Sequence, residues 1–276
     1  MPLNIDLHIH TNFSDGALSV KEVLLAAKEK KLSTISITDH DNVNAIKAAQ
    51  RLGKKLDIDV IPGLEISTDV EDKEVHLLGY FIDVDNEELK KYLSFFREER
   101  YYRAKRMIAK LNKLKIDISI DDVLTQANNS SIGRPHIANA LIKANYVKDY
   151  YEAFQKYLRD FGPAYERKIH ISAQSAIKLI SDAGGLSFIA HPGHLKESIL
   201  MELINSGIDG IEVIHPSHSE YQIKFYRAIV SQYCLLESGG SDFHGGTKKD
   251  DDNLGKYKIN SKNLEAMKYR LQKNSR

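Results

Sequence analysis

Cysteine is nearly absent from this chain of 276 residues, which contains one, Cys234. A single thiol excludes an intrachain disulfide framework and a cysteine-rich zinc finger. Cys234 lies in the apolar-leaning stretch 233–236, where a buried, inert thiol is the usual case. We therefore expect Cys234 to be buried and structural.

The sequence also lacks long apolar runs and an excess of charge of either sign. No run approaches the roughly 18 to 20 apolar residues that a membrane span needs. The first ten residues lead directly into His8 and His10, which leaves no room for a signal peptide. With 39 basic and 38 acidic residues, the chain has no global attraction to nucleic acid or membranes. We expect a cytoplasmic protein that involves no membrane and no obligate protein partner.

Strand-type runs alternate with helical patterns at both ends of the chain. Ser19 with Glu22 forms a capping box, which predicts a helix reaching about residue 31. Gly184 and Gly207 stand where helices should stop. This alternation predicts an α/β fold with a mainly parallel sheet or barrel.

The middle of the chain contains helical patterns only, beginning with a long charged helix at residues 87–115. A second helical pattern covers residues 150–161. We therefore expect a first part of the barrel at residues 1–86, an all-helical insertion domain at 87–166 and a second part of the barrel at 167–276.

Histidines and carboxylates close several of the strand-type runs. His8 and His10 are two residues apart, so both rings face the same side of an extended strand. Further clusters follow at His40, Glu65, His76, His191, and Asp242 with His244. Barrel strands that each end in a metal-ligating side chain converge on one point. The set predicts a multinuclear metal hydrolase.

Three aspartates near these histidines are candidates for holding the imidazole rings. Asp39 and Asp41 flank His40, and either a hydrogen bond to the imidazole or a role in the turn accounts for them. Asp6 precedes His8 on the same strand face and is another candidate for a hydrogen bond that fixes a metal-ligating histidine.

Six segments resemble motifs of the PHP (polymerase and histidinol phosphatase) family and occur in the family's order: DLHIHTNFSDG, ITDHD, PGLEIS, VHLLGY, AHPG and SDFH. The resemblance spans residues 3 to about 246, apart from the helical insertion. It implies a distorted (β/α)7 TIM-like barrel with its site at the C-terminal ends of the strands. It also implies two or three divalent metal ions.

By position, the resemblance implies three sets of ligands. The first set is His8, His10, Glu65 and Asp242. The second is His76 and His191, with Glu65 bridging. The third is Asp15, His40 and His244, where many family members have a histidine in place of Asp15, so the occupancy of this site is open. Mixed imidazole and carboxylate ligands fit manganese, iron or zinc, and we expect Mn²⁺.

The charge of the expected metal ions indicates the type of reaction, hydrolysis of a phosphoester. Metal ions a few Å apart share a bridging hydroxide near neutral pH and orient phosphorus for in-line attack. The sequence contains no Gly-x-Ser-x-Gly elbow that would supply a protein nucleophile. We therefore expect a phosphoric ester hydrolase that uses a metal-bridging hydroxide.

The insertion supplies a clue to the substrate. The segment GRPHIA places Arg134 and His136 at the start of a predicted helix, with Pro135 in its first turn. Helix-terminal N–H groups and a guanidinium fork favour phosphate, although a surface arginine at a helix start is the plain alternative. GRPHIA also resembles the branch of 3′,5′-nucleoside bisphosphate phosphatases, which convert pAp to AMP and phosphate.

That branch also contains 5′→3′ exoribonucleases that act on short 5′-phosphorylated RNA. The resemblance therefore implies a small phosphorylated nucleotide, or short RNA, as the substrate. It further implies that Arg134 and His136 bind the 5′-phosphate while the reaction occurs at the 3′ side.

Two further histidines, His215 and His218, follow a predicted strand at residues 210–214. Each of them is a candidate for contacting the substrate or for protonating the leaving 3′-oxygen. The alternative for each is that it caps the following helix. Two other functions stay open: histidinol-phosphate phosphatase, and a non-catalytic metal-binding PHP module. GRPHIA counts against the first, and the complete ligand set counts against the second.

Overall fold

The computed structural model describes residues 4–71, 73–127, 131–193, 195–246 and 248–274. Contacts divide the chain into two compact units. Unit 1 consists of Met1–Lys90 and His170–Arg276, and unit 2 consists of Lys91–Ile169.

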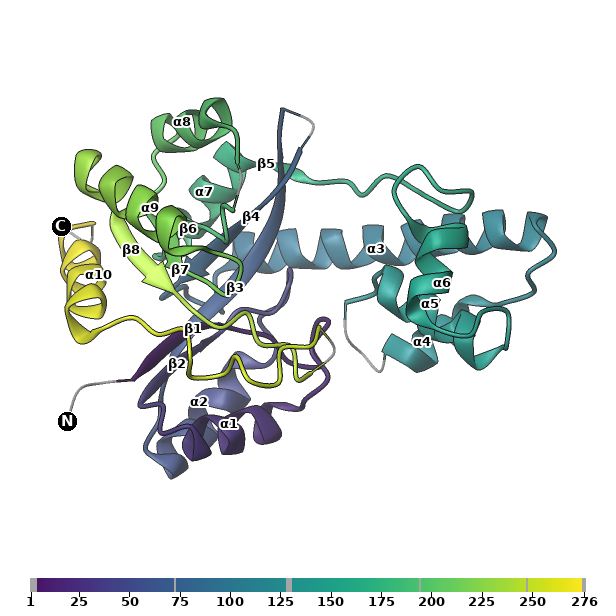
Figure 1. The fold of residues 1–276 in the computed structure, drawn as a ribbon, viewed down its shortest axis with the longest axis horizontal. Coiled ribbons are helices and arrows are strands. Elements are labelled where there is room, and N and C mark those ends of the chain that lie inside the picture. The colour runs from purple at the N-terminus through teal and green to yellow at the C-terminus, as the bar shows by residue number, and fades with distance from the viewer. Residues whose placement is uncertain (1–3, 72, 128–130, 194, 247, 275–276) are drawn as a thin grey trace. The chain divides into compact units, whose positions relative to one another are not determined.

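Seven strands of unit 1 form a sheet that curves into a nearly closed barrel (Figure 1). In spatial order they are β1 (Ile5–Ile9), β2 (Thr34–Ile37), β3 (Asp59–Val70), β4 (Lys73–Tyr80), β6 (Leu186–Ile189), β7 (Gly210–Ile214) and β8 (Leu236–Gly239). The two edges of the sheet approach where Ile9 pairs with Phe243 in a parallel bridge. The predicted distorted barrel is confirmed.

Strand β4 departs from the parallel arrangement, since it is antiparallel to both of its neighbours, β3 and β6. The chain length explains this. β3 ends at Val70 and β4 begins at Lys73, which leaves room only for a hairpin turn, whereas a parallel connection needs a dozen or more residues. A further short strand, β5 (Ile171–Ser172), pairs with β3.

The helices of unit 1 lie outside the strands (Figure 1). They are α1 (Val20–Glu29), α2 (Ile46–Leu56), α7 (Ala173–Asp182), α8 (Glu197–Asn205), α9 (Glu220–Gln232) and α10 (Ser261–Asn274). The predicted capping box at Ser19 opens α1. Strands β1, β2 and β6 are buried along their whole length, as expected for apolar strands that helices cover. No helix in the described ranges has the length and apolar character to span a membrane.

The described part of unit 2 is helical. It contains α3 (Glu87–Lys113), which begins in unit 1, then α4 (Ile120–Ala127), α5 (Arg134–Lys143), α6 (Tyr150–Ala153) and the π-helical turn η1 (Phe154–Leu158). Unit 2 has its own apolar core, to which Met107, Leu111 and Leu141 contribute fully buried side chains. The helix predicted at 150–161 ends at Leu158 and changes to π geometry after Ala153.

The prediction that Cys234 is buried is wrong, because its side chain is exposed. Cys234 follows α9 and has a left-handed φ of +52°. The Leu235 N–H donates to the Val230 carbonyl oxygen at 2.9 Å, and the Cys234 N–H donates to the Ser231 carbonyl oxygen at 3.5 Å. This is the Schellman pattern that ends a helix. Cys234 therefore occupies a turn at the surface rather than the following strand.

Candidate metal centre

His8 and His10 lie at the C-terminal end of β1 and are fully buried. Their Nε2 atoms approach to 3.1 Å. Gly240, directly after β8, leaves the space that this requires, since a Cβ there would lie 2.4 Å from the His8 backbone nitrogen. The two-residue spacing thus directs two imidazole nitrogens to one point.

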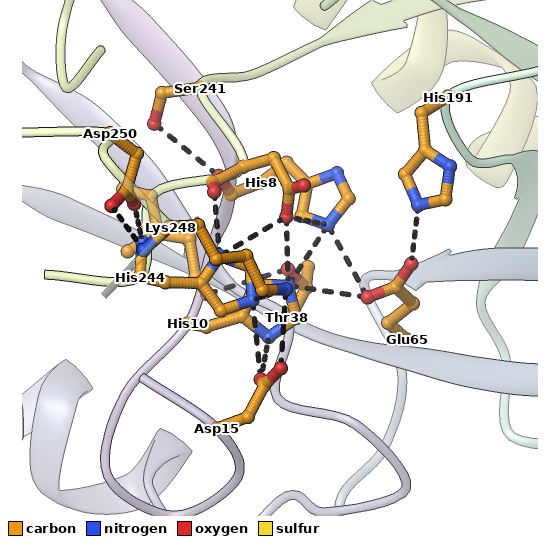
Figure 2. A network of polar contacts seen from close by, with 12 residues as sticks. His8, His10, Asp15, Thr38, Glu65, His191, Ser241, His244, Lys248 and Asp250 are labelled. Atoms are coloured by element: carbon orange, nitrogen blue, oxygen red, sulfur yellow. Dashed lines mark hydrogen bonds and ion pairs between the residues drawn. The ribbon is translucent and has the colours of Figure 1, made fainter. Parts of the chain in front are cut away.

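Glu65 of β3 is the carboxylate around which the histidines gather (Figure 2). Its Oε2 lies 3.4 Å from His8 Nε2 and 3.2 Å from His10 Nε2. Its Oε1 lies 2.9 Å from His76 Nδ1 and 3.0 Å from His191 Nε2. Glu65 therefore connects side chains from three separate stretches of the chain.

Asp242, which follows β8, completes the group around the two β1 histidines. Its Oδ1 lies 3.3 Å from the Nε2 atoms of both His8 and His10. Asp242 has a φ of +49°, and His191 has a φ of +26°. Such conformations are strained in residues other than glycine, and they cluster at functional sites.

A third group consists of Asp15, His40 and His244, beside His10. Asp15 Oδ1 lies 3.2 Å from His244 Nε2, and Asp15 Oδ2 lies 4.0 Å from His40 Nε2. The rings of His10 and His244 stack with centroids 4.2 Å apart. His40 also reaches Glu65, with 3.2 Å between Nδ1 and Oε2, so this group is continuous with the others.

The structure brings all nine residues selected from the sequence into one cluster. Three overlapping groups have donor atoms that lie within 4.8 Å of one another: His10 with Asp15, His40 and His244; His8 with His10 and Glu65; His40 with Glu65 and His76. His191 and Asp242 join them through the contacts given above.

The donor set fits divalent metal ions. Asp15 Oδ1, His40 Nδ1 and His76 Nδ1 are buried and have no hydrogen-bond partner within the described ranges. Their short approaches inside the cluster lack hydrogen-bond geometry. A cation among them would satisfy these atoms, and imidazole nitrogen with carboxylate oxygen suits manganese, iron or zinc.

The three carboxylates of the cluster remain ionised. Burial would raise the pKa of Glu65, but the charged His76 and His8 and a hydrogen bond from His10 hold this pKa well below its usual value. Histidine charges likewise outweigh burial and keep the pKa values of Asp15 and Asp242 well below normal. The chain therefore supplies three negative charges at neutral pH.

The histidines differ in their protonation. Burial opposes a proton on His10, but hydrogen bonds to Asp242 and Glu65 raise its pKa to about 9. The pKa of His76 is also raised to about 9, because the Glu65 carboxylate outweighs burial. Burial dominates at His40 and lowers its pKa to about 3. A metal ion bound by His10 or by His76 must therefore displace the proton of that histidine.

Glu212 of β7 supports the centre and was not selected from the sequence. Its Oε1 lies 2.9 Å from His8 Nδ1, and its Oε2 accepts the backbone N–H of His191 at 2.7 Å. With Nδ1 of His8 directed at a carboxylate, Nε2 is left to face the centre. A signal was present, because an acidic residue stands between Ile211 and Val213 in an apolar strand.

Asp39 and Asp6 hold backbone segments in place. Asp39 accepts hydrogen bonds from the Thr11 N–H at 2.8 Å and from the Ser14 hydroxyl at 2.6 Å. This geometry favours the turn explanation for Asp39. Asp6 accepts the backbone N–H of Ser241 at 2.9 Å, and burial raises the pKa of Asp6 to about 6.

His215 lies just after β7 and directs one ring nitrogen at the centre. The Ser217 backbone N–H donates to His215 Nδ1 at 3.1 Å, so Nε2 carries the ring hydrogen. That Nε2 lies 3.5 Å from Asp242 Oδ2. It is buried and has no hydrogen-bond partner in the part of the chain that the structure describes. His215 thus offers an N–H group to the centre.

His218 has both ring nitrogens engaged within the protein. Its Nδ1 lies 2.9 Å from the Val213 carbonyl oxygen, and its Nε2 accepts the Gly193 N–H at 3.1 Å. Burial lowers the pKa of His218. Ser219, and not His218, caps the next helix, α9. Through its two contacts His218 instead holds the segment after β6.

Arg134 and His136 begin helix α5 in unit 2. The Gly133 N–H donates to His136 Nδ1 at 3.0 Å. Arg134 Nη1 donates to Asp160 Oδ1 at 2.6 Å and to the Leu158 carbonyl at 3.1 Å. The arginine is therefore anchored at the helix N-terminus while 26% of its side chain stays exposed.

Comparisons with known proteins agree with this picture. A family model described as the PHP domain matches residues 6–169. A 3′,5′-nucleoside bisphosphate phosphatase of Chromobacterium violaceum is 34% identical over 87% of both chains. A phosphoribosyl 1,2-cyclic phosphate 1,2-diphosphodiesterase of Eggerthella lenta is 29% identical and covers 87% of this chain and 94% of its own.

Two more similarities extend the comparison. The 5′-3′ exoribonuclease Rnm of Salmonella typhimurium is 31% identical over 87% of this chain and 84% of its own. A solved structure described as a metal-dependent phosphoesterase of Bifidobacterium adolescentis is 30% identical, covers 98% of both chains and has a TM-score of 0.87.

Proposed function

The chain belongs to the PHP domain family of metal-dependent phosphoester hydrolases, and from this premise we propose that it removes the 3′-phosphate of 3′,5′-bisphosphonucleotides. With pAp, water adds to phosphorus, the bond between phosphorus and the 3′-oxygen breaks, and AMP and phosphate leave. The observation that carries the proposal is Arg134 at the first position of α5. A guanidinium and helix-terminal N–H groups suit a second phosphate that does not react.

The metal ions would be held by the nine residues of the cluster: His8, His10, Asp15, His40, Glu65, His76, His191, Asp242 and His244. When bound, divalent ions supply a water molecule of lowered pKa and neutralise phosphate oxygens. We expect Mn²⁺, with Fe²⁺ or Zn²⁺ as alternatives. The three ionised carboxylates would offset part of the positive charge of the ions, and Glu212 would orient the His8 ring.

His215 would stabilise the leaving group. Its Nε2–H faces the centre beside Asp242, and Ser217 fixes the ring. A neutral imidazole that gave up this hydrogen would become an anion, so His215 acts as a hydrogen-bond donor to the departing 3′-oxygen. Such a donor lowers the barrier because it contacts charge that develops in the transition state.

Arg134 and His136 would bind the 5′-phosphate. Arg134 now donates to Asp160 and to a carbonyl oxygen, and a phosphate would take up the same N–H groups with stronger charge complementarity. Binding energy from a phosphate that does not react orients the one that does. A short RNA with a 5′-phosphate presents the same pair of groups, which supports exoribonuclease action as an extension of this function.

Other substrates compete with this proposal. The relative from Eggerthella lenta supports a phosphoribosyl cyclic phosphate as the competing substrate class. Histidinol phosphate has a single phosphate, so Arg134 would have no partner in it. A non-catalytic metal-binding module would not need the complete set of donors around Glu65.

The test is phosphate release from pAp in the presence of Mn²⁺, measured beside histidinol phosphate, 5′-AMP and phosphoribosyl 1,2-cyclic phosphate. We expect fast release from pAp with AMP as the product. A preference for histidinol phosphate or for phosphoribosyl 1,2-cyclic phosphate would keep the metal centre and contradict the nucleotide substrate. If the protein binds metal but hydrolyses none of these four compounds, the proposed phosphatase activity is wrong.

A further inference from the structure

Lys248 reaches the Asp15 side of the centre from the segment that follows β8 (Figure 2). Its Nζ lies 3.2 Å from Asp15 Oδ2 and 2.6 Å from His244 Nε2. His244 Nδ1 lies 2.7 Å from the Asp242 carbonyl oxygen. The ring hydrogen is therefore on Nδ1, and Nε2 accepts a hydrogen bond from the ammonium.

This contact excludes a metal ion from the same donors. The nitrogen lone pair of His244 Nε2 can serve the lysine ammonium or a cation, but not both at once. The Asp15 carboxylate likewise neutralises whichever charge lies next to it. His10, Asp15, His40 and His244 form a group with a single carboxylate, and the tethered ammonium lies beside that carboxylate.

The segment is built to keep the Lys248 backbone in this place. The backbone N–H groups of His244, Gly246 and Lys248 all donate to the Asp250 carboxylate. Gly245 and Gly246 have left-handed φ values of +73° and +88°, which lets the chain curl around this buried carboxylate. The Lys248 side chain itself is 50% exposed, so it can swing into solvent without disturbing the loop.

We propose that Lys248 and a metal ion are alternative occupants of the position between Asp15 and His244. At low metal concentration the ammonium serves as the third cation of the centre, and at high concentration a metal ion displaces it toward solvent. The inference rests on the proposed metal centre and goes beyond it, because it makes the occupancy of the third site depend on the supply of metal.

The first test is a titration of the metal-free protein with Mn²⁺, in which electron paramagnetic resonance measures the free ion. In the wild-type protein, we expect two tighter sites and a weaker third one. In Lys248→Met, the third site should bind about tenfold more tightly, because the ion no longer has to break a hydrogen bond to a charged group.

Lys249→Met is the matched control. Lys249 is the exposed next residue of the same segment, so its removal changes the net charge equally and leaves the Asp15 contact intact. This variant should bind Mn²⁺ as the wild-type protein does. Unchanged third-site affinity in Lys248→Met, or equal tightening in both variants, would overturn the proposal.

A second measurement uses the wild-type protein alone. Acetic anhydride labels free amines, and mass spectrometry reports the labelling of each lysine. The labelling of Lys248 should rise as the third Mn²⁺ binds, while that of Lys249 stays constant as the internal reference. Constant labelling of Lys248 across that step would overturn the proposal. A wild-type protein that binds no Mn²⁺ would instead refute the metal centre and the proposed function with it.

Discussion

The Glu212 carboxylate holds His8 and His191 together, with one oxygen 2.9 Å from His8 Nδ1 and the other 2.7 Å from the His191 backbone nitrogen. A single side chain thus orients one candidate ligand and supports the left-handed backbone of another. Burial would raise the pKa of Glu212, but the charge of His8 lowers it. The carboxylate therefore stays ionised although no part of it reaches solvent.

Glu212→Gln should weaken metal binding. The amide keeps the shape but loses the charge that fixes the His8 tautomer, and support of this kind is worth about 10- to 100-fold in metal affinity. Calorimetric titration with Mn²⁺ measures the loss. Glu237→Gln on the neighbouring strand, where Glu237 pairs with Arg227, should change nothing. An equal loss in the two variants would contradict the assigned role.

Gly240→Ala should both destabilise the protein and disturb the centre. The new Cβ would lie 2.4 Å from the His8 backbone nitrogen and 2.5 Å from its Cβ, where no flexible atom can give way. We expect about 1–3 kcal/mol of lost unfolding free energy in urea, as for other overpacked sites, together with weaker metal binding.

Gly207→Ala is the contrast to Gly240→Ala. Gly207 has a φ of +88° and open space around it, so the substitution should cost about 1–2 kcal/mol of backbone strain and leave metal affinity unchanged. Equal effects of both variants on metal affinity would refute the packing argument.

His215→Ala should reveal its role through the leaving group. Loss of one donor to a developing oxyanion lowers kcat about 10²- to 10³-fold, and we expect this loss with pAp. With p-nitrophenyl phosphate, whose leaving group needs little stabilisation, the loss should be far smaller. His218→Ala should lower the melting temperature and affect both substrates alike. The same loss on both substrates in His215→Ala would rule out contact with the leaving oxygen.

Arg134→Ala should act on nucleotide binding alone. A hydrogen bond between charged partners is worth enough to raise KM for pAp about 10- to 100-fold, whereas hydrolysis of an aryl monophosphate should not change. Lys143→Ala removes the same charge from the other end of α5 and serves as the control. Equal losses of Arg134→Ala on both substrates would show that Arg134 does not bind the 5′-phosphate.

Metal binding should release protons at neutral pH. His10 and His76 have pKa values of about 9 in the folded chain, against 6.5 for the free side chain, and both must lose their protons to bind an ion. Calorimetry in buffers of different ionisation enthalpy should detect this release. Metal affinity should rise with pH and level off above about 9.

The same shifts predict how the metal-free protein responds to pH. The raised pKa values stabilise the fold fully below pH 6.5, and this contribution is lost as the pH rises through about 9. Urea unfolding of the metal-free protein across this range measures the effect. A metal affinity that does not depend on pH below 9 would contradict both expectations.

Local patterns in the sequence predicted many helix ends and strands of the fold. The capping box at Ser19, the glycines after α7 and α8, and the apolar strand at Gly210–Ile214 each depend on neighbouring residues only. The hairpin of β3 and β4 and the exposure of Cys234 were missed. Strand direction and helix ends depend on where the chain turns, which apolar periodicity does not encode.

The sequence by itself determined that His8 and His10 share one face, because the strand period is two residues, and its resemblance to the PHP motifs implied the rest of the set. Glu65 and His76 lie inside β3 and β4 rather than at strand ends, so strand-end position alone did not select them. Only the tertiary structure decided what surrounds them. Glu212 meets His8 across 204 positions of sequence, and Gly240 makes room for the same residue from the far edge of the barrel. The tautomer of His215 and the approach of Lys248 to Asp15 likewise depend on loops packed against one another. Contacts between residues so far apart in the chain arise only when the barrel closes, since closure alone fixes the distances between its strand ends.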